Sequence, residues 1–405
     1  MCWELTMNRG LHVFRCHATA FPLWVLYGVL GLCPHAFAGN GVFVPLRATL
    51  DTPTQNPVLT LLPDGRVMTI SATSTVAVYN PGTDILTAVA TLTTVRPEAS
   101  GLLLPNGKVL VLGGALPNLT TEVFDPSTST VAAGPAVLAP RSFATYTRLA
   151  DGRIFVAGGC IDNGCSARVA TTEIFDPATG QFTAGPNMAH SRSLHTATLL
   201  TDGRVLLVAG VGFSTTCPNV PSCFLNDAEL YSPTTNSFTA KPILMTTSDA
   251  GDERELHATA LAGNGTAITC GGYFQYYGSS YRVLGVCSIF HPATNTFTDG
   301  PTISPRQVHT ATTLADGSVL MAGGSGIYTT GIDTADLYDP ATGLGLPLIG
   351  DGSRDVMTTL RTAASAVRLL DGSVLFVGGG LDLAFNPLAS MERYVPDRVF
   401  VSTFE

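Results

Sequence analysis

Residues 192–210 read RSLHTATLLTDGRVLLVAG, and this pattern decides the fold. A partly alternating, β-rich segment runs to Leu200, the pair Asp202-Gly203 makes a two-residue turn, and an almost continuous apolar run follows at Arg204–Val208. Glycine supplies the positive φ that hairpin turns of this kind need. A short apolar run bounded by turn residues is typical of a strand buried on both faces. The stretch therefore predicts a β-hairpin with a buried second strand.

The same landmarks recur seven times along the chain. Their common element is an Asp-Gly or Asn-Gly turn, found at Asp64-Gly65, Asn106-Gly107, Asp151-Gly152, Asp202-Gly203, Asn264-Gly265, Asp316-Gly317 and Asp371-Gly372. Ten residues before the turn the units have Thr54, Arg96, Arg141, Arg192, Arg254, Arg306 and Arg361. Seven and eight residues after five of the turns stand Gly113-Gly114, Gly158-Gly159, Gly271-Gly272, Gly323-Gly324 and Gly378-Gly379. The spacing between turns varies from 42 to 62 residues while these offsets stay constant, which indicates one small repeated unit with variable loops.

Each unit continues with two further strands. An aromatic residue ends the third strand, at Tyr79, Phe124, Phe175, Tyr231, Phe290, Tyr338 and Tyr394. A proline follows two residues later in every unit, and it ends the pairing because proline cannot donate to a ladder. Seven residues after the aromatic an apolar residue starts an outer strand, at Leu86, Val131, Phe182, Phe238, Phe297 and Val401. Only the sixth unit departs from this, with Gly345. The unit is a four-stranded antiparallel meander.

Four strands cannot bury both faces alone, so such units stack, and stacking in a ring leaves only short edges. We therefore predict an all-β fold, a seven-bladed β-propeller of four-stranded antiparallel blades. The glycine pair after the second strand and the acid-x-aromatic-x-Pro stretch resemble the kelch β-propeller family over roughly residues 50–404. Kelch repeats usually carry tryptophan where this chain has Phe182, Phe238 and Phe297, and smaller aromatics can fill the same gap between blades.

The first 38 residues do not fit the repeat. Arg9 and Arg15 precede the apolar run Phe21–Leu32, and the small-residue site Ala36-Phe37-Ala38 follows. This order is that of a secretory signal peptide, and the apolar run is shorter than the roughly 20 residues that a membrane span needs. We expect cleavage after Ala38 and a secreted or periplasmic protein with no stable membrane span.

The remaining residues, 39–405, are expected to form the single propeller. The repeats lie near 50–95, 96–140, 141–191, 192–246, 247–303, 304–358 and 359–405. The last unit is expected to complete its own outer strand with Val399–Phe404, and two placements stay open for Gly41–Thr49, beside that strand or elsewhere.

Net charge and cysteine content indicate which classes of partner are disfavoured and whether the cysteines form disulfides. The chain is 45% hydrophobic and 13% charged, with a net charge of −9, which argues against nucleic acid or an anionic membrane as a partner. Six cysteines remain after the leader, two in each of three consecutive repeats. An even number in an exported chain indicates disulfides, which we expect at Cys160–Cys165, Cys217–Cys223 and Cys270–Cys287.

The arginine series has a matching series of acids. Two residues before the third-strand aromatic stand Glu122, Glu173, Glu229, Asp336 and Glu392. A repeated arginine–carboxylate pair that joins strands or blades explains both series. Ser288 occupies the acid position in the fifth unit, so we expect Arg254 to be the arginine without this partner.

Three histidines stand three residues after an arginine in consecutive units, namely His195, His257 and His309. Three imidazoles converging near the axis would make a metal site. The kelch resemblance gives them a structural role instead, because R-x-x-H is a common kelch pattern. We therefore predict no metal and no other cofactor, with these three residues as the candidates should a metal bind.

Loops of variable length on a rigid scaffold are where function concentrates. The loops after the glycine pairs and the connections between blades lie on one face, which we call the long-loop face. Two stretches there form a candidate ligand patch: Tyr273, Phe274, Tyr276, Tyr277 and Tyr281, with Asp249, Asp252, Glu253 and Arg254. Aromatic faces beside carboxylates suit sugars. The alternative is that the rings form a small satellite core over the long Cys270–Cys287 loop.

We expect a monomeric scaffold that binds a protein or glycan ligand on the long-loop face. The alternative is a carbohydrate-active enzyme: a hydrolase, an epimerase or a galactose-oxidase-like metal oxidase. The resemblance to that copper enzyme implies a cysteine cross-linked to a tyrosine, two histidines and a second tyrosine on the metal. In this chain all six mature cysteines have disulfide partners and no Tyr-His pair is adjacent in sequence, so we favour binding over catalysis.

Overall fold

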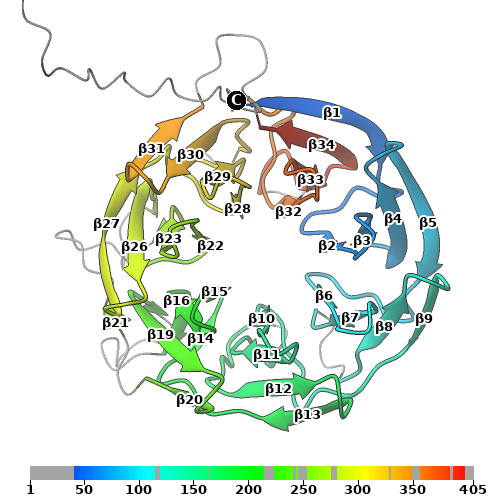
Figure 1. Ribbon diagram of the computed structural model, residues 1–405, viewed down its shortest axis with the longest axis horizontal. Coiled ribbons are helices and arrows are strands. Elements are labelled where there is room, and N and C mark those ends of the chain that lie inside the picture. The colour runs from blue at the N-terminus through cyan, green and yellow to red at the C-terminus, as the bar shows by residue number, and fades with distance from the viewer. Residues whose placement is uncertain are drawn as a thin grey trace, which may run out of the picture. The chain divides into compact units, whose positions relative to one another are not determined.

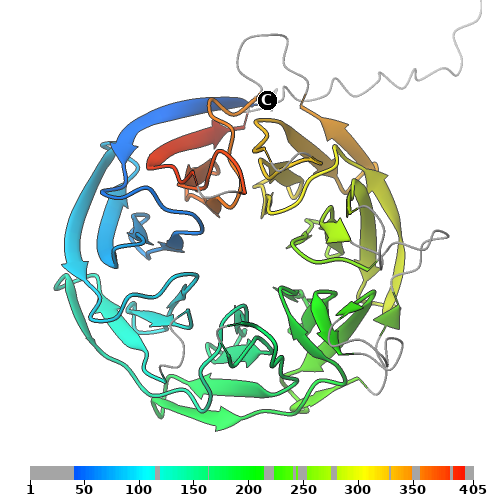
Figure 2. The same cartoon turned by 180° about the vertical axis from the view of Figure 1, so that it is seen from behind.

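The computed structural model describes residues 41–396, apart from 115–118, 163, 214–222, 240–242, 245–252, 275–280, 328–329, 349–355 and 384–385. Seven antiparallel sheets stand as blades around a central axis, as Figures 1 and 2 show from opposite faces. The predicted all-β propeller is confirmed. The described residues contain no helix, and so none that is long and apolar enough to cross a membrane. The predicted leader at 1–38 lies outside the described residues.

In each blade the strands follow one another from the axis outward (Figure 1). Blades 1 and 2 consist of β2 (Val58–Leu61), β3 (Val67–Ile70), β4 (Thr75–Asn80) and β5 (Ile85–Thr91), then β6 (Ser100–Leu103), β7 (Val109–Leu112), β8 (Glu122–Asp125) and β9 (Thr130–Ala133). Blade 3 consists of β10 (Thr145–Arg148), β11 (Ile154–Ala157), β12 (Thr172–Asp176) and β13 (Gln181–Ala184). Blade 4 consists of β15 (Thr196–Leu199), β16 (Val205–Val208), β19 (Asp227–Ser232) and β20 (Ser237–Phe238), with β21 (Ile243–Leu244) also paired to β19.

Blade 5 consists of β22 (Ala258–Leu261), β23 (Ala267–Cys270), β26 (Val286–His291) and β27 (Thr296–Thr302). Blade 6 consists of β28 (Thr310–Thr313), β29 (Val319–Ala322), β30 (Ala335–Asp339) and β31 (Leu344–Pro347). Blade 7 consists of β32 (Ser365–Arg368), β33 (Val374–Val377), β34 (Ser390–Val395) and β1 (Val42–Thr49). The loops of blades 4 and 5 add a small sheet of β14 (Ser191–Ser193), β17 (Val211–Phe213) and β18 (Cys223–Phe224), and a hairpin of β24 (Tyr273–Phe274) and β25 (Arg282–Val283).

The core lies between the blades. Every residue of the second strands β3, β7, β11, β16, β23, β29 and β33 is buried, as their almost continuous apolar sequences predict. The third-strand aromatics are buried too, and Phe155 of blade 3 stacks on Tyr231 of blade 4 with ring centroids 4.0 Å apart. Each large side chain buried in this way stabilises the fold by roughly 1.5–3 kcal/mol.

The outer strands show that phenylalanine suffices where kelch repeats usually have tryptophan. Phe182 packs on Phe175 and Phe297 packs on Phe290, with ring centroids 4.9 and 5.1 Å apart. The sixth blade also has its outer strand, because Gly345 pairs with Tyr338 although it offers no apolar side chain. Backbone pairing with β30 is enough to hold this strand.

The ring closes through the N-terminal strand. β1 pairs antiparallel with β34, with Val42 opposite Val395 and Phe43 opposite Tyr394, so blade 7 combines the two ends of the described chain (Figure 1). The expectation that the last unit supplies its own outer strand from Val399–Phe404 is wrong, because β1 takes the outer edge of β34 and β33 takes the inner one. Residues 397–405 lie outside the described residues.

Buried arginines hold the blades together, as the two matching series predict. Arg306 is fully buried, and its Nη1 donates to the carbonyls of Gly323 and Thr334 at 2.8 and 2.9 Å, while its Nη2 pairs with Asp336. The pairs Arg141–Glu173, Arg192–Glu229 and Arg361–Glu392 repeat this arrangement. Blade 1 lacks both members, with Thr54 and Ala77 at these positions.

The carboxylates also fix the connections between blades. Glu173 accepts hydrogen bonds from the backbone N–H groups of Leu138 and Ala139, and Glu229 accepts them from Ala189 and His190. In blade 2 Glu122 accepts from Thr93 and Thr94 in the same way, but the predicted ion pair with Arg96 does not form there, and Arg96 Nη2 donates to Thr120 Oγ1 at 2.8 Å. Each acid therefore satisfies otherwise unpaired backbone donors in the segment that precedes the arginine.

The prediction that Arg254 takes part in the ligand patch is wrong. Its side chain is fully buried, and Nη1 donates to the carbonyl oxygens of Gly271 and Val286 at 3.3 and 3.1 Å. The serine at position 288 removes the carboxylate from this blade but does not release the arginine. Arg254 is a structural residue and is not available to a ligand.

In blades 3 to 7 the glycine eight residues after the turn joins one blade to the next. Gly159 donates its N–H to the Arg192 carbonyl at 2.8 Å. The equivalent glycines of blades 4, 5 and 6 donate in the same way to the backbone carbonyl of the next blade's arginine. Gly379 donates to Thr54, which stands in the arginine position of blade 1. These glycines have φ near +94°, and a Cβ at Gly210 would lie 2.5 Å from the Ser193 carbonyl oxygen. Only glycine fits this position.

Candidate functional site

The long-loop face is opposite the Asp-Gly turns, because an antiparallel meander places its first and third turns at one end. At the entrance to the channel on the long-loop face stands a ring of seven residues that we call the mouth ring. Each lies two residues after the arginine position and just before an innermost strand: Asn56, Glu98, Phe143, Leu194, Leu256, Val308 and Ala363.

All seven mouth-ring residues have positive φ, between 47° and 60°. Backbone hydrogen bonds join several of them from blade to blade, as when Val308 donates to Leu256 at 2.8 Å and Asn56 to Ala363 at 2.7 Å. Non-glycine residues in this conformation cost on the order of 1–3 kcal/mol each and cluster at functional sites. The chain thus maintains an unusual backbone at the channel entrance.

The aromatic loop of blade 5 reaches the long-loop face beside this ring. Tyr281 is 40% exposed and donates its hydroxyl to the Ile327 carbonyl of blade 6 at 2.8 Å. Tyr273 is half-buried, with its ring centroid 5.9 Å from that of Tyr281. Phe274 is buried against Phe224 of blade 4, so it belongs to a satellite core and not to an exposed ligand patch. Phe274 therefore fits the satellite-core interpretation, and the ligand patch stays a prediction for the exposed rings.

Glu255, the last acid of the same sequence stretch as Asp249, Asp252 and Glu253, completes this surface. Its backbone pairs with that of Tyr273 in both directions, at 3.1 and 2.8 Å. Burial raises the pKa of the half-buried Glu255 carboxyl to about 7, and the positive charge of Arg168 offsets this effect only in part. Arg168 comes from blade 3, and its Nε donates to Ser193 Oγ of blade 4 at 3.1 Å. We call Glu255, Tyr273, Tyr281, Arg168 and Ser193 the Glu255 cluster.

A carboxyl with a pKa near 7 can hold or release a proton under ordinary conditions, and such groups concentrate at functional sites. Burial also raises the pKa of the Tyr273 hydroxyl, with further contributions from Glu255 and Tyr281. The sequence distinguishes Glu255 in one way. The position directly after the arginine position holds no charged residue in the other units, which have Gln55, Pro97, Ser142, Ser193, Gln307 and Thr362. Glu255 is the one acid in that series.

Disulfides hold the loops that carry this cluster. Cys160–Cys165 and Cys270–Cys287 form as predicted. The backbone of Cys160 bridges to that of Arg168, so the first disulfide lies in the loop that positions the Arg168 guanidinium. The second joins β23 to β26 at the base of the aromatic loop. The third predicted pair, Cys217–Cys223, involves Cys217, which lies outside the described residues.

The other predicted patch residues are only partly described. Asp249, Asp252, Tyr276 and Tyr277 lie outside the described residues, and their place in the patch stays a prediction. Glu253 is half-buried next to the buried Arg254. The described part of the patch that faces outward is therefore Tyr273, Tyr281 and Glu253.

The three histidines lie in separate gaps between blades. His195 Nε2 contacts the Thr145 hydroxyl of the preceding blade at 2.9 Å, and His257 Nε2 contacts Thr196 in the same way at 3.1 Å. The equivalent partner of His309 would be Ala258, which has no hydroxyl, and neither nitrogen of His309 has a hydrogen-bond partner among the described residues.

Burial lowers the pKa of His257 to about 3 and those of His195 and His309 well below the usual value. The histidines are therefore neutral packing residues. No group of three or more His, Cys, Asp and Glu side chains placed to hold a metal occurs within the described ranges.

Comparison with known proteins agrees with this geometry. A family model for the Kelch motif matches residues 149–189, which span the turn of blade 3, its buried second strand, β12 and the outer strand. The chain is a kelch-type β-propeller. The motif match covers one repeat, and the seven blades of the structure extend the same unit around the ring.

Two solved structures are similar to this kelch-type propeller. One is a fungal alcohol oxidase of the AA5 family in complex with copper, at 18% identity and a TM-score of 0.65, covering 88% of this chain and 76% of that one. The other is YjhT, at 14% identity and a TM-score of 0.56, covering 75% of this chain and 99% of that one. At these identities the likeness concerns the fold.

The described residues of this propeller do not fit a copper centre of the galactose-oxidase kind. Cys160, Cys165, Cys270 and Cys287 are joined in disulfides, so none of the four is available for a link to tyrosine. His195 and His257 each contact a threonine in their own gap, and no adjacent tyrosine and histidine occur in the sequence.

Proposed function

We propose that this kelch-type propeller is an exported, monomeric scaffold that binds carbohydrate on its long-loop face. The observation that carries the proposal is the Glu255 cluster, in which the exposed Tyr281 ring lies next to the ring of Tyr273, and Tyr273 lies near the Glu255 carboxyl. The C–H faces of a sugar pack on such rings while its hydroxyls bond polar side chains at the edge. Arg168 and Ser193 supply those polar groups from two other blades.

Export is supported by the disulfides, because disulfides persist in oxidising compartments. The net charge of −9 supports a neutral glycan, and not a nucleic acid, as the ligand. The secretory leader at 1–38 is part of the proposal.

The test is a glycan array read with the full chain and two variants. We expect Tyr281→Ala to weaken binding about 2- to 12-fold, which corresponds to the roughly 0.5–1.5 kcal/mol that aromatic contacts contribute. Leu370→Ala is the matched control, because Leu370 is 72% exposed and stands beside the Asp371-Gly372 turn of the opposite face. Equal losses in the two variants, or no glycan retained by the unmodified chain, would count against the proposal.

The second candidate is a carbohydrate-active hydrolase, and the pKa of Glu255 favours it. Glycoside hydrolysis uses a protonated carboxyl to donate to the leaving oxygen. Because the pKa is about 7, Glu255 is protonated below that pH and ionised above it, so activity that uses it as an acid falls as the pH rises through 7.

For this candidate we expect Glu255→Gln to lower kcat about 10²- to 10⁴-fold, because the amide cannot transfer a proton. The measurement is release of reducing sugar from oligosaccharides between pH 4 and 9, with Gln307→Ala, which changes the equivalent position of blade 6, as the control. A binding scaffold gives no turnover with either protein and retains most of its affinity in Glu255→Gln.

A further inference from the structure

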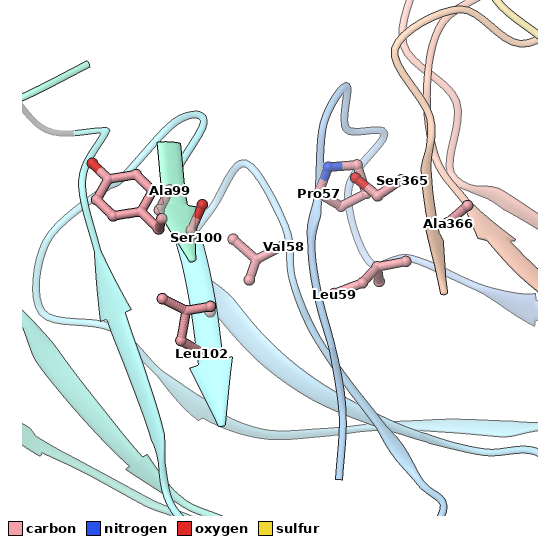
Figure 3. A pocket seen from close by; sticks show the side chains of 10 residues that line it. Pro57, Val58, Leu59, Ala99, Ser100, Leu102, Ser365 and Ala366 are labelled. Atoms are coloured by element: carbon pink, nitrogen blue, oxygen red, sulfur yellow. The ribbon is translucent and has the colours of Figure 1, made fainter. Parts of the chain in front are cut away.

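One side of the central channel contains a cavity of about 300 Å³ between the innermost strands of blades 7, 1, 2 and 3. Figure 3 shows its lining, in which side chains from β2, β6 and β32 surround one space. β2 and β32 come from opposite ends of the described chain and become neighbours through ring closure. No residue of the Glu255 cluster lines the cavity, so the cavity is a separate feature.

The sequence explains why the cavity lies on this side. Three residues after the arginine position, blades 4, 5 and 6 carry the three histidines, whose rings fill the gaps beside the channel. Blades 7, 1, 2 and 3 have Ala364, Pro57, Ala99 and Ala144 at that position. Pro57 and Ala99 both line the cavity. Small residues in place of imidazoles leave the space open.

The lining defines the chemistry that the cavity accepts. None of its lining residues is charged, so it offers no counter-ion to a charged ligand. Ser100 and Ser365 contribute hydroxyls, and these two hydroxyls form no hydrogen bond with another described residue. Val58 and Ala366 contribute apolar surface beside them. Polar groups of this kind in a concave, partly apolar site fix the orientation of a small ligand.

The innermost strands add backbone groups. β2, β6 and β32 each pair on one side only, so their other edges face the channel. Edge strands present N–H and C=O groups that are ready to bond a partner. A molecule with several hydroxyls matches such alternating donors and acceptors, whereas a hydrocarbon would leave them unsatisfied. The volume of about 300 Å³ lies at the lower end for ligand sites, which suits a molecule the size of one sugar unit.

We propose that this channel cavity is a binding site for a small neutral polyhydroxy compound, a monosaccharide or a short polyol. The Tyr146 side chain completes the lining, and its hydroxyl lies against Gly113, where a side chain would collide with it. The site acts independently of the carbohydrate surface around Glu255.

The test is saturation-transfer NMR on the full chain with glycerol, xylose and xylonate as probes. We expect glycerol and xylose to bind with about millimolar affinity, given the few heavy atoms of each, and the charged xylonate at least tenfold more weakly. Ala366→Leu fills the cavity and is expected to abolish the xylose signal. Ala311→Leu, the same position in blade 6, lies outside the cavity lining and should leave the signal unchanged.

Ser365→Ala guards against a folding defect in the filled variant, because it removes one hydroxyl from the cavity lining and adds no volume. We expect it to weaken xylose binding about 2- to 12-fold. Tyr281→Ala and Glu255→Gln should not alter the xylose signal, which separates this site from the proposed glycan surface. No transfer to either neutral probe, tighter binding of xylonate, or an equal signal in Ala366→Leu and the unmodified chain would overturn the proposal.

Discussion

Replacing Arg361 with methionine is expected to lower the free energy of unfolding by about 3–5 kcal/mol, the cost of breaking a buried ion pair by removing one partner. Arg361 is 1% exposed, and its guanidinium pairs with Glu392 and donates to the carbonyls of Gly378 and Ser390 at 2.8 and 2.9 Å. Methionine fills much of the volume, but it leaves the buried Glu392 carboxylate without its counter-charge and removes one donor from the carbonyls of Gly378 and Ser390. Urea unfolding at equilibrium measures the loss.

Two further variants test whether the loss comes from leaving a buried charge unpaired. Arg66→Met removes an exposed pair with Asp64 and should cost at most about 1 kcal/mol. Arg361→Met combined with Glu392→Met should recover at least about 1 kcal/mol relative to the sum of the single losses, because no charge is then buried alone. Blade 1, which has Thr54 and Ala77 at these positions, shows that a blade forms without the pair. A loss in Arg361→Met no larger than in Arg66→Met would contradict this account.

The fold was predictable because its determinants are local. The Asp-Gly turn, the apolar second strand and the aromatic-x-Pro stretch each lie within about fifty residues, and every blade repeats them, so errors in one unit are corrected by the others. Even the arginine–carboxylate pairs follow from two series with constant offsets. Arg254 was misjudged because its partners are carbonyl oxygens, which every residue carries and no sequence pattern reveals.

The candidate site was less predictable because it is assembled from different blades. Glu255 acquires its raised pKa only when folding buries it near Tyr273 and brings Arg168 from blade 3 within electrostatic reach. The widest separation among these residues in the chain is 105 positions, from Arg168 to Tyr273, so no local sequence pattern links them. The aromatic loop was predictable from its composition. Which of its rings are buried depends on Phe224, a neighbour from another blade.

Ring closure was unpredictable for a related reason. β1 has no turn that links it to β34, so its register is set by a partner nearly the whole chain away. The sequence of Gly41–Thr49 shows an apolar residue at Phe43 but nothing that identifies the strand it pairs with. In the structure Phe43 is 1% exposed and lies between Phe376 and Tyr394, with ring centroids 5.8 and 5.1 Å away.

Phe43→Ala is therefore expected to lower the free energy of unfolding by about 3–5 kcal/mol, the usual cost of truncating a buried phenylalanine. The loss should be expressed as opening of the ring, because Phe43 anchors the strand that joins the two chain ends. Urea unfolding measures the energy, and limited proteolysis measures how often β1 detaches.

Val44→Ala is the matched control, since Val44 is the next residue of the same strand and is 36% exposed. It keeps the pairing with Arg393 and should cost less than about 1 kcal/mol, with no increase in cleavage within β1. If Phe43→Ala were as stable and as resistant to protease as Val44→Ala, β1 would not be the strand that closes the ring.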